Sequence, residues 1–270
     1  MRKGFIYTDK DNVRGGKKYC EGDTVLSDRY PIPGGIGFFE NMFDCFGNGH
    51  AFVPGFHMAE VAICGDVVAD KHGNLTTNKV VVLSSFPVDR LMESEGTMLE
   101  IATRDGGILK YVKEPSAELQ MACVATTPSM LSIVKQTKEL CLCAVSHNGK
   151  GIRFAKRQGN DVCRAALMAD PYAIKYIRKP QKWMYRMALD EDWHCLSVIG
   201  TPSEEICLYA LEKSWEALQY MHPQTDKVIR KALSIDRRAM AFVELGERNR
   251  ICLSRYTSTY EAELLRELGY

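Results

Sequence analysis

The chain lacks several features that would place it in a common class of protein. It has no apolar run long enough to span a membrane, and its N-terminus lacks the apolar stretch of a signal peptide. Its formal net charge is only +1, so bulk charge selects no partner. Its ten cysteines show no paired C-x-x-C spacing. We therefore expect reduced thiols and a cytoplasmic location.

Recognised catalytic and cofactor motifs are also missing. The sequence contains no G-x-x-x-x-G-K-[ST], no G-x-G-x-x-G opening a helix, no H-E-x-x-H and no G-x-S-x-G. His50 and His57 lie seven residues apart and Glu60 follows three later, which is not a recognised metal-ligand pattern. We expect no cofactor and no metal.

A fixed period dominates the second half of the chain. Six consecutive 22-residue units fill residues 115–246 without a gap. Aligned on one another, they place alanine in one column: Ala122, Ala144, Ala166, Ala188, Ala210 and Ala232. A repeat of this length is typical of a solenoid, in which each unit buries its apolar face against the next.

The other columns predict what each unit contains. Apolar residues four before and one after the alanine form one helical face. Eight residues after the alanine comes a second apolar column. Between the two faces lies a column of residue types that cap helix N-termini: Thr126, Asn148, Asp170, Asp192, Ser214 and Asp236. Each unit is therefore expected to be a helix, a tight turn and a capped second helix.

These patterns predict an α+β protein. Residues 1–87 are rich in glycine, proline and β-formers and are expected to form a small, mainly β domain. Residues 88–114 look like a linker or degenerate capping repeat, residues 115–246 like a solenoid of six helix-turn-helix repeats, and residues 247–270 like a C-terminal cap.

Within the first domain, strands are expected at Gly4–Tyr7, Met58–Cys64, Val67–Val68 and Lys79–Leu83. A helical turn is expected at Glu40–Cys45.

Three segments of the first domain resemble an uncharacterised domain family of phage and bacterial proteins. They are Gly35–Phe46, Ala59–Val68 and Thr77–Val81, against a G-[FL]-H-x-C-x-N-P-L-D segment, an A-E-V strand and T-N-K. Phe38 stands where that family has its histidine. The units, such as Leu140–Gly149, resemble a second uncharacterised bacterial and phage family of short helical repeats with an A-V-x-x-N-G core.

The two resemblances imply a phage or mobile-element protein, which would place it in the host cytoplasm. They imply no known activity. The function we expect is an accessory binding protein that acts through protein–protein interaction, plausibly by inhibiting a host or defence protein. The sequence leaves the oligomeric state open.

An enzyme is the first alternative. The order of a glycine-rich strand, a helix with an aromatic residue and an A-E-V strand is loosely similar to ADP-ribosyltransferases. The candidate residues for that activity are Tyr7, His50, His57 and Glu60. The alternative of a β scaffold without catalysis is favoured, and we assign no catalytic residue.

Charge alternates along the repeats. Residues 148–186 hold ten Lys or Arg against two Asp, and residues 187–216 hold seven Asp or Glu against one Lys. The basic stripe predicted to bind a partner consists of Arg153, Lys156, Arg157, Arg164, Lys175, Arg178, Lys179 and Lys182. The predicted acidic band consists of Asp190, Glu191, Glu204, Glu205 and Glu212.

Three interpretations of this pattern compete. The cations could simply favour helix C-termini as solvated surface. A protein partner could carry complementary charge bands, which is the interpretation we prefer. A nucleic acid or nucleotide could bind the basic stripe, with Tyr172, Tyr176 and Trp183 available for stacking. The adjacent acidic band argues against a long nucleic acid, because its backbone needs continuous positive potential.

Overall fold

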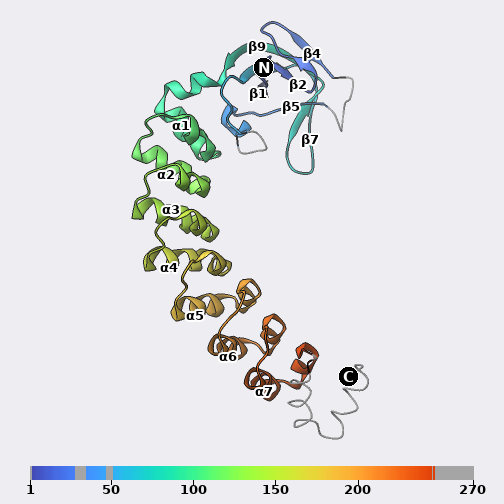
Figure 1. Ribbon diagram of the computed structural model, residues 1–270. Coiled ribbons are helices and arrows are strands. Elements are labelled where there is room, and N and C mark those ends of the chain that lie inside the picture. The colour runs from blue at the N-terminus through green and yellow to red at the C-terminus, as the bar shows by residue number, and fades with distance from the viewer. Residues whose placement is uncertain (1, 28–34, 47–50, 245, 247–270) are drawn as a thin grey trace. The chain divides into compact units, whose positions relative to one another are not determined.

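The computed structural model describes residues 2–27, 35–46, 51–244 and 246. The fold is α+β, as predicted, with small antiparallel sheets at the N-terminal end of the chain and helices after them (Figure 1). The chain divides into two compact units, Met1–His147 and Asn148–Tyr270. The predicted cap at residues 247–270 lies outside the described residues.

The main sheet of the first unit has four antiparallel strands in the order β1-β6-β9-β4. Their bounds are β1 Arg2–Thr8, β6 His57–Ile63, β9 Lys79–Pro87 and β4 Thr24–Leu26. One face of the sheet buries a core in which every residue is apolar: Ile6, Tyr19, Val25, Ile36, Phe38, Ala59, Val61, Val80 and Val82. The predicted strands in this region are confirmed. Their alternating apolar residues need one covered face, and this core covers it.

Smaller elements complete the β-rich region. A three-stranded sheet has the order β5-β8-β7, and β2 pairs with β3. The bounds of these elements are β2 Val13–Arg14, β3 Lys17–Lys18, β5 Ile36–Phe38, β7 Val67–Ala69 and β8 Leu75–Thr77. The predicted helical turn is the 3₁₀ helix η1, Met42–Cys45, which the Asn41 side chain caps by accepting from the Phe43 amide at 2.9 Å.

Helices fill the rest of the first unit. Their bounds are η2 Val88–Glu93, α1 Glu95–Ala102, η3 Gly106–Tyr111, α2 Ala117–Thr126, η4 Pro128–Ser132 and α3 Lys138–His147. Two carboxylates of these helices hold the loop before β6: Asp105 accepts from the Phe52 amide at 3.0 Å and Asp89 from the Gly55 amide at 2.7 Å. Residues 88–114, expected to be a linker or degenerate capping repeat, hold η2, α1 and η3.

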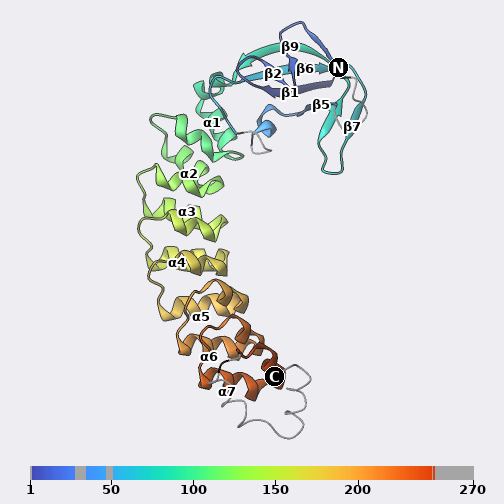
Figure 2. The same ribbon diagram turned by 45° about the vertical axis from the view of Figure 1, so that its right-hand side comes forward.

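The second unit alternates α-helices of ten residues with 3₁₀ helices of six residues. Their bounds are η5 Gly149–Phe154, α4 Asn160–Ala169, η6 Pro171–Tyr176, α5 Lys182–Glu191, η7 Trp193–Val198, α6 Glu204–Lys213, η8 Trp215–Tyr220, α7 Asp226–Ile235 and η9 Arg237–Phe242. Each α-helix contacts the next α-helix, and each 3₁₀ helix contacts the next 3₁₀ helix, so the unit has an α layer and a 3₁₀ layer (Figure 2).

The second helix of each predicted pair is therefore a short 3₁₀ helix. Six residues close few i→i+4 hydrogen bonds, and i→i+3 bonds satisfy the backbone better over so short a segment. The predicted cap residues do begin these helices. Asn148, Asp170, Asp192, Ser214 and Asp236 each accept from the amide two residues later, as Asp170 does from Tyr172 at 2.8 Å.

The prediction is wrong for the first repeat, which is displaced by one residue. Thr126 is the last residue of α2, and its hydroxyl donates to the Ala102 and Ala122 carbonyls at 2.7 and 3.0 Å. Ser116 caps α2 by accepting from the Leu119 amide at 3.1 Å, so this helix starts one residue later than the others. Cys123, rather than Ala122, is consequently the fully buried small residue. The other five alanines of the column are fully buried, as predicted.

Candidate functional site

The predicted basic stripe falls on two different surfaces of the second unit. Arg164 lies on α4 and Lys182 on α5, within the α layer. The other six residues lie on η5, η6 and the turns that follow them. We call these six the basic ridge: Arg153, Lys156, Arg157, Lys175, Arg178 and Lys179. All six are exposed.

Two contacts hold the parts of the basic ridge side by side. The Arg153 guanidinium lies 4.5 Å from the ring centre of Phe154 and 6.0 Å from that of Tyr176, on the next 3₁₀ helix. The Arg178 guanidinium donates to the Ala155 carbonyl at 3.2 Å and the Lys156 carbonyl at 3.0 Å. Arg178 therefore binds carbonyls at the end of η5. This contact agrees with the interpretation in which the cations favour helix C-termini.

Four of the six ridge cations lack an acidic partner in the described part of the chain. Within the part of the chain that the structure describes, Arg153, Arg157, Lys175 and Lys179 form no ion pair. Asp170, at the start of η6, instead caps that helix and pairs with Lys150 at 3.5 Å. These four cations are consequently uncompensated among the described residues.

The acidic band behaves differently, because cations of neighbouring repeats pair with it. Glu205 pairs with Lys182 and with Arg186, the latter at 3.3 Å, and Glu204 pairs with Lys227 at 3.1 Å.

The third paired member of the band is Asp190. It pairs with Lys213 and accepts from the Tyr209 hydroxyl at 2.7 Å. The hydrogen bond from Lys213 is the main cause that lowers the pKa of Asp190, and the bond from Lys182 does the same for Glu205. Glu191 and Glu212 are exposed and make no ion pair among the described residues. The α layer therefore neutralises most of its own charge.

The aromatic residues expected to stack on a nucleic acid do not form one platform. Trp183 lies on α5, under the Arg164 guanidinium at 4.9 Å. Tyr176 lies in the 3₁₀ layer beside Arg153, and the Tyr172 hydroxyl donates to the Asp192 carboxylate at 3.1 Å. The three rings are thus divided between the two layers and engaged with protein groups.

The candidate residues of the enzyme alternative are not assembled into a site. Tyr7 is buried, and its hydroxyl donates to the Ala51 carbonyl and accepts from the Val53 amide, both at 3.1 Å. Burial raises the pKa of Tyr7 to about 12, so the hydroxyl stays protonated. His50 lies outside the described residues.

His57 and Glu60 point to opposite faces of β6, because Glu60 lies three positions after His57 along a strand in which side chains alternate. Glu60 pairs with Lys3 at 2.7 Å, on the neighbouring strand β1. His57 shares its face with Ala59, which belongs to the core of the main sheet. These positions suit a β scaffold.

Sequence reasoning missed one repeat column that carries structure. The last residue of successive units is Gln136, Gln158, Pro180, Pro202 and Gln224. The Gln158 amide donates at 3.0 Å to the carbonyls of Ile152 and Tyr176, and its oxygen accepts from the Arg178 amide at 2.9 Å. Gln224 makes the equivalent three bonds to Leu218, Phe242 and Glu244. The 22-residue recurrence of glutamine could have revealed this clamp between repeats.

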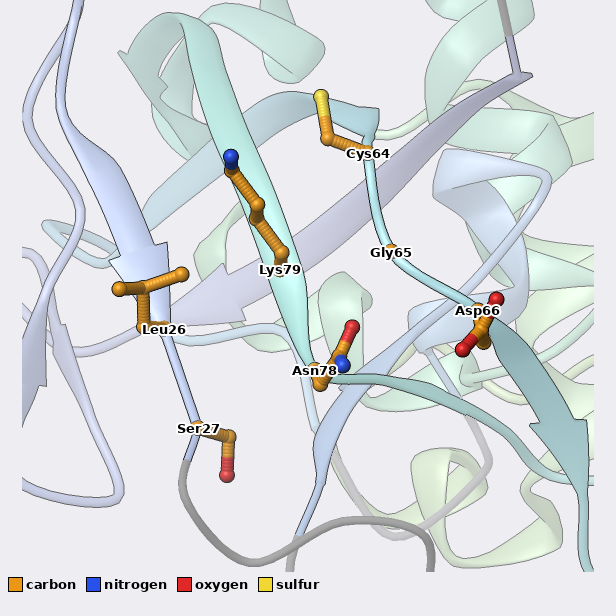
Figure 3. Close-up of a pocket in the computed structure, with 7 residues that line it drawn as sticks. All are labelled: Leu26, Ser27, Cys64, Gly65, Asp66, Asn78 and Lys79. Carbon is orange, nitrogen blue, oxygen red and sulfur yellow. The ribbon is translucent and has the colours of Figure 1, made fainter.

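Sequence reasoning also missed a pocket at one end of the main sheet, shown in Figure 3. It has a volume of about 500 Å³. The residues that line it come from the ends of β4, β6 and β9: Leu26, Ser27, Cys64, Gly65, Asp66, Asn78 and Lys79. Several of them belong to the segments that carry the first family resemblance, although no site was expected there.

Buried thiols supply no nucleophile in the repeats. Burial raises the pKa of Cys123 and of Cys195 to about 12, and that of Cys207 to about 11. All the cysteines in the described ranges are free. Those ranges also hold no cluster of three or more His, Cys, Asp or Glu side chains that could bind a metal ion.

No helix in the described part of the chain has both the length and the apolar character required to cross a bilayer. Comparisons of the chain with protein-family models, curated proteins and solved structures find no match.

Proposed function

We propose that the chain is a binding module whose six 22-residue units stack into one α-solenoid, and that its basic ridge binds an acidic segment of a partner protein. The observation that carries the proposal is the division of charge in the second unit. Cations of the α layer pair with carboxylates of neighbouring repeats, whereas four cations of the ridge have no such pair in the described residues.

Uncompensated charge of one sign favours a partner of the opposite sign. Complementary charges speed association and fix the register in which two proteins meet. Exposed charges contribute little to folding stability even when they are paired. The ridge cations can therefore bind a partner without a large loss of folding stability. A host or defence protein as the partner rests on the family resemblance alone.

A protein partner suits the surface better than a nucleic acid does. The three candidate stacking rings are engaged within the protein and divided between two layers. A single-strand binder usually combines a basic groove with aromatic platforms on the same surface. The self-paired acidic band, however, repels a polyanion less than its sequence suggests. Nucleic acid therefore enters the test as a competing outcome.

The experiment compares two variants with the same change in net charge. The ridge variant replaces Arg153, Arg157, Lys175 and Lys179 with glutamine. The control replaces the paired cations Lys182, Arg186, Lys213 and Lys227 with glutamine. Arg178 stays unchanged in both because it holds the backbone of the preceding turn.

The probes are a fluorescent polyglutamate peptide and a single-stranded DNA oligonucleotide, measured by anisotropy at several salt concentrations. We expect the peptide to bind wild type and the control, and to lose most of its affinity for the ridge variant or at high salt. Tighter binding of the DNA would favour the nucleic-acid alternative. Peptide binding that survives the ridge substitutions, or no peptide binding at low salt, would contradict the proposal.

A further inference from the structure

Several arginines of the described residues lie over an aromatic ring and also hold a carboxylate. The Arg238 guanidinium lies 5.1 Å from the ring centre of Trp215. Its Nε donates to the Asp236 Oδ1 at 3.1 Å, and its Nη2 donates to the Asp236 Oδ2 at 2.7 Å. The ring thus covers a face of the guanidinium, and the carboxylate takes its N–H edge. The same combination of ring and carboxylate occurs at Arg2, Arg104 and Arg186.

Arg153 has the aromatic part of this arrangement without the carboxylate. Its guanidinium lies 4.5 Å from the ring centre of Phe154 and 6.0 Å from that of Tyr176. The side chain is exposed, and within the described ranges it forms no hydrogen bond or ion pair. The N–H donors of Arg153 therefore remain available to an acceptor from another molecule.

We propose that Arg153 is the anchor of the basic ridge, and that its guanidinium binds one carboxylate of an acidic segment through two hydrogen bonds. This inference rests on the proposed function, because it names the ridge residue that receives an aspartate or glutamate side chain. A planar guanidinium and a planar carboxylate match in two parallel N–H···O bonds, as they do between Arg238 and Asp236. The lysines of the ridge act as point charges and cannot form this contact.

The two rings prepare Arg153 for this contact. A long side chain that is free in solution loses conformational freedom when a ligand fixes its head. Cation–π contacts with Phe154 and Tyr176 already restrict the Arg153 guanidinium before a partner arrives. Arginine and aromatic residues are also enriched among the residues that dominate binding at protein interfaces. Arg153 is therefore expected to contribute more to binding than the other unpaired ridge cations.

Arg164, in the α layer, provides the contrast. Its guanidinium lies 4.9 Å from the ring centre of Trp183, and it too forms no ion pair among the described residues. Asp161 stands three residues before it on α4, so the local charge is of mixed sign. The ridge that contains Arg153 otherwise holds only cations: Lys156, Arg157, Lys175, Arg178 and Lys179. A carboxylate is therefore attracted to Arg153 more strongly than to Arg164.

The first test locates the carboxylate. The full-length protein is titrated with N-acetylated triglutamate at millimolar concentration, and the Nε–Hε signals of its arginines are recorded by NMR. The variants Arg153→Lys and Arg164→Lys assign the two signals by removing them. We expect the Arg153 signal to shift saturably and the Arg164 signal to stay in place. N-acetylated triglutamine, which lacks the carboxylates, is the matched probe and should shift neither.

The second test separates the guanidinium from its charge. Arg153→Lys keeps the charge of the ridge, so it should weaken the binding of fluorescent polyglutamate about five-fold, the effect of one lost hydrogen bond. The dependence of its affinity on salt should stay that of wild type. Lys175→Gln removes a charge instead and should reduce the salt dependence. Arg164→Lys, the same exchange at a ring-stacked arginine of the α layer, is the matched control and should leave the affinity unchanged.

The outcomes separate this inference from the proposed function. If polyglutamate binds the ridge while the Arg153 signal stays in place, or while Arg153→Lys binds as tightly as wild type, Arg153 is not the anchor and the proposed function stands. If triglutamate shifts the Arg153 signal saturably while polyglutamate binding survives the ridge substitutions, the carboxylate site stands and the proposed function fails. If neither peptide binds, both are wrong.

Discussion

Particular buried polar side chains of the repeats and of the β-rich region differ in whether they are hydrogen-bonded. In the repeats, Gln158 and Gln224 each make three bonds to backbone atoms, and the cap residues each satisfy an amide. In the β-rich region, the Thr77 hydroxyl and the Asn78 Oδ1 have no partner among the described residues.

The difference shows where each region can take part in binding. Gln158 and Gln224 are engaged with the backbone of the repeats, whereas Arg153, Arg157, Lys175 and Lys179 are exposed and can meet a partner. Among the described residues, the β-rich region keeps two buried oxygens, those of Thr77 and Asn78, without a hydrogen bond. A buried polar atom without a hydrogen bond costs folding free energy.

Ala188→Leu, in the repeats, is expected to lower the free energy of unfolding more than any of the substitutions that follow. This alanine is completely buried on α5 where neighbouring helices approach. Three added carbon atoms have no space, and overpacking should lower the free energy of unfolding by about 3 kcal/mol. The measurement is urea denaturation followed by circular dichroism. Met168→Leu, at a side chain 67% exposed, is the control and should have almost no effect. If Ala188→Leu left the free energy of unfolding unchanged, the alanine column of the repeats would not mark positions of close helix contact.

The glutamine clamp should give the next largest effect. Gln158→Leu leaves two carbonyls and one amide without their partner, so we expect the free energy of unfolding to fall by about 2 kcal/mol. Gln219→Leu removes a single bond, to the Glu216 carbonyl at 3.0 Å, and should cost much less. Denaturation of both variants side by side checks the prediction. Equal losses would mean that the clamp adds nothing beyond one ordinary hydrogen bond.

A pair of threonines tests the β-rich side, with an expected change of sign. The buried Thr8 hydroxyl bonds to the Asn12 side chain and the His57 carbonyl, both at 3.2 Å, so Thr8→Val should cost about 1 kcal/mol. Thr77→Val removes an unpartnered hydroxyl and should leave stability unchanged or raise it by up to about 1 kcal/mol. Thermal denaturation in ligand-free buffer compares them. If Thr77→Val destabilises as much as Thr8→Val, the Thr77 hydroxyl has a partner after all.

The smallest effect concerns acid stability. The pKa of Asp190 is lower in the folded chain than in the unfolded chain, mainly because Lys213 donates to it. Its contribution is therefore present above the unfolded pKa, near 4, and is lost as the pH falls through the folded pKa. Asp190→Asn should reduce the loss of stability in that window only slightly, by about 0.5 kcal/mol or less, since the pair is largely exposed. Denaturation midpoints between about pH 2 and 6 would show it. A difference between wild type and Asp190→Asn that stays the same from neutral pH down to the acid end of this range would contradict this assignment.

The sequence was sufficient for the local architecture of the repeats. The cap column and the buried alanines follow from a short-range rule that recurs every 22 residues, and the structure confirms both after the first repeat. The first repeat was misplaced by one residue because Ser116, rather than Pro115, starts its helix. Two competing cap positions next to one another are not resolved by periodicity alone.

The β-rich elements were predictable as strands, but their pairing was not. Alternation locates β6 and β9, whereas the order β1-β6-β9-β4 depends on contacts between distant segments. The pocket depends on the same contacts. Gly65 and Asn78 are thirteen residues apart in the sequence, and only the pairing of β6 with β9 brings them together.

The charge pattern shows most clearly which features follow from the sequence and which follow from the tertiary structure. The sequence by itself determined that basic and acidic blocks alternate along the repeats, because charge follows directly from residue type. Only the tertiary structure decided which charges remain open. Stacking places Glu205 of α6 beside Lys182 of α5, whereas Lys175 and Lys179 face no carboxylate in the described residues. An ion pair depends on the distance between two side chains in space, and that distance is set by how neighbouring repeats pack rather than by their order in the chain.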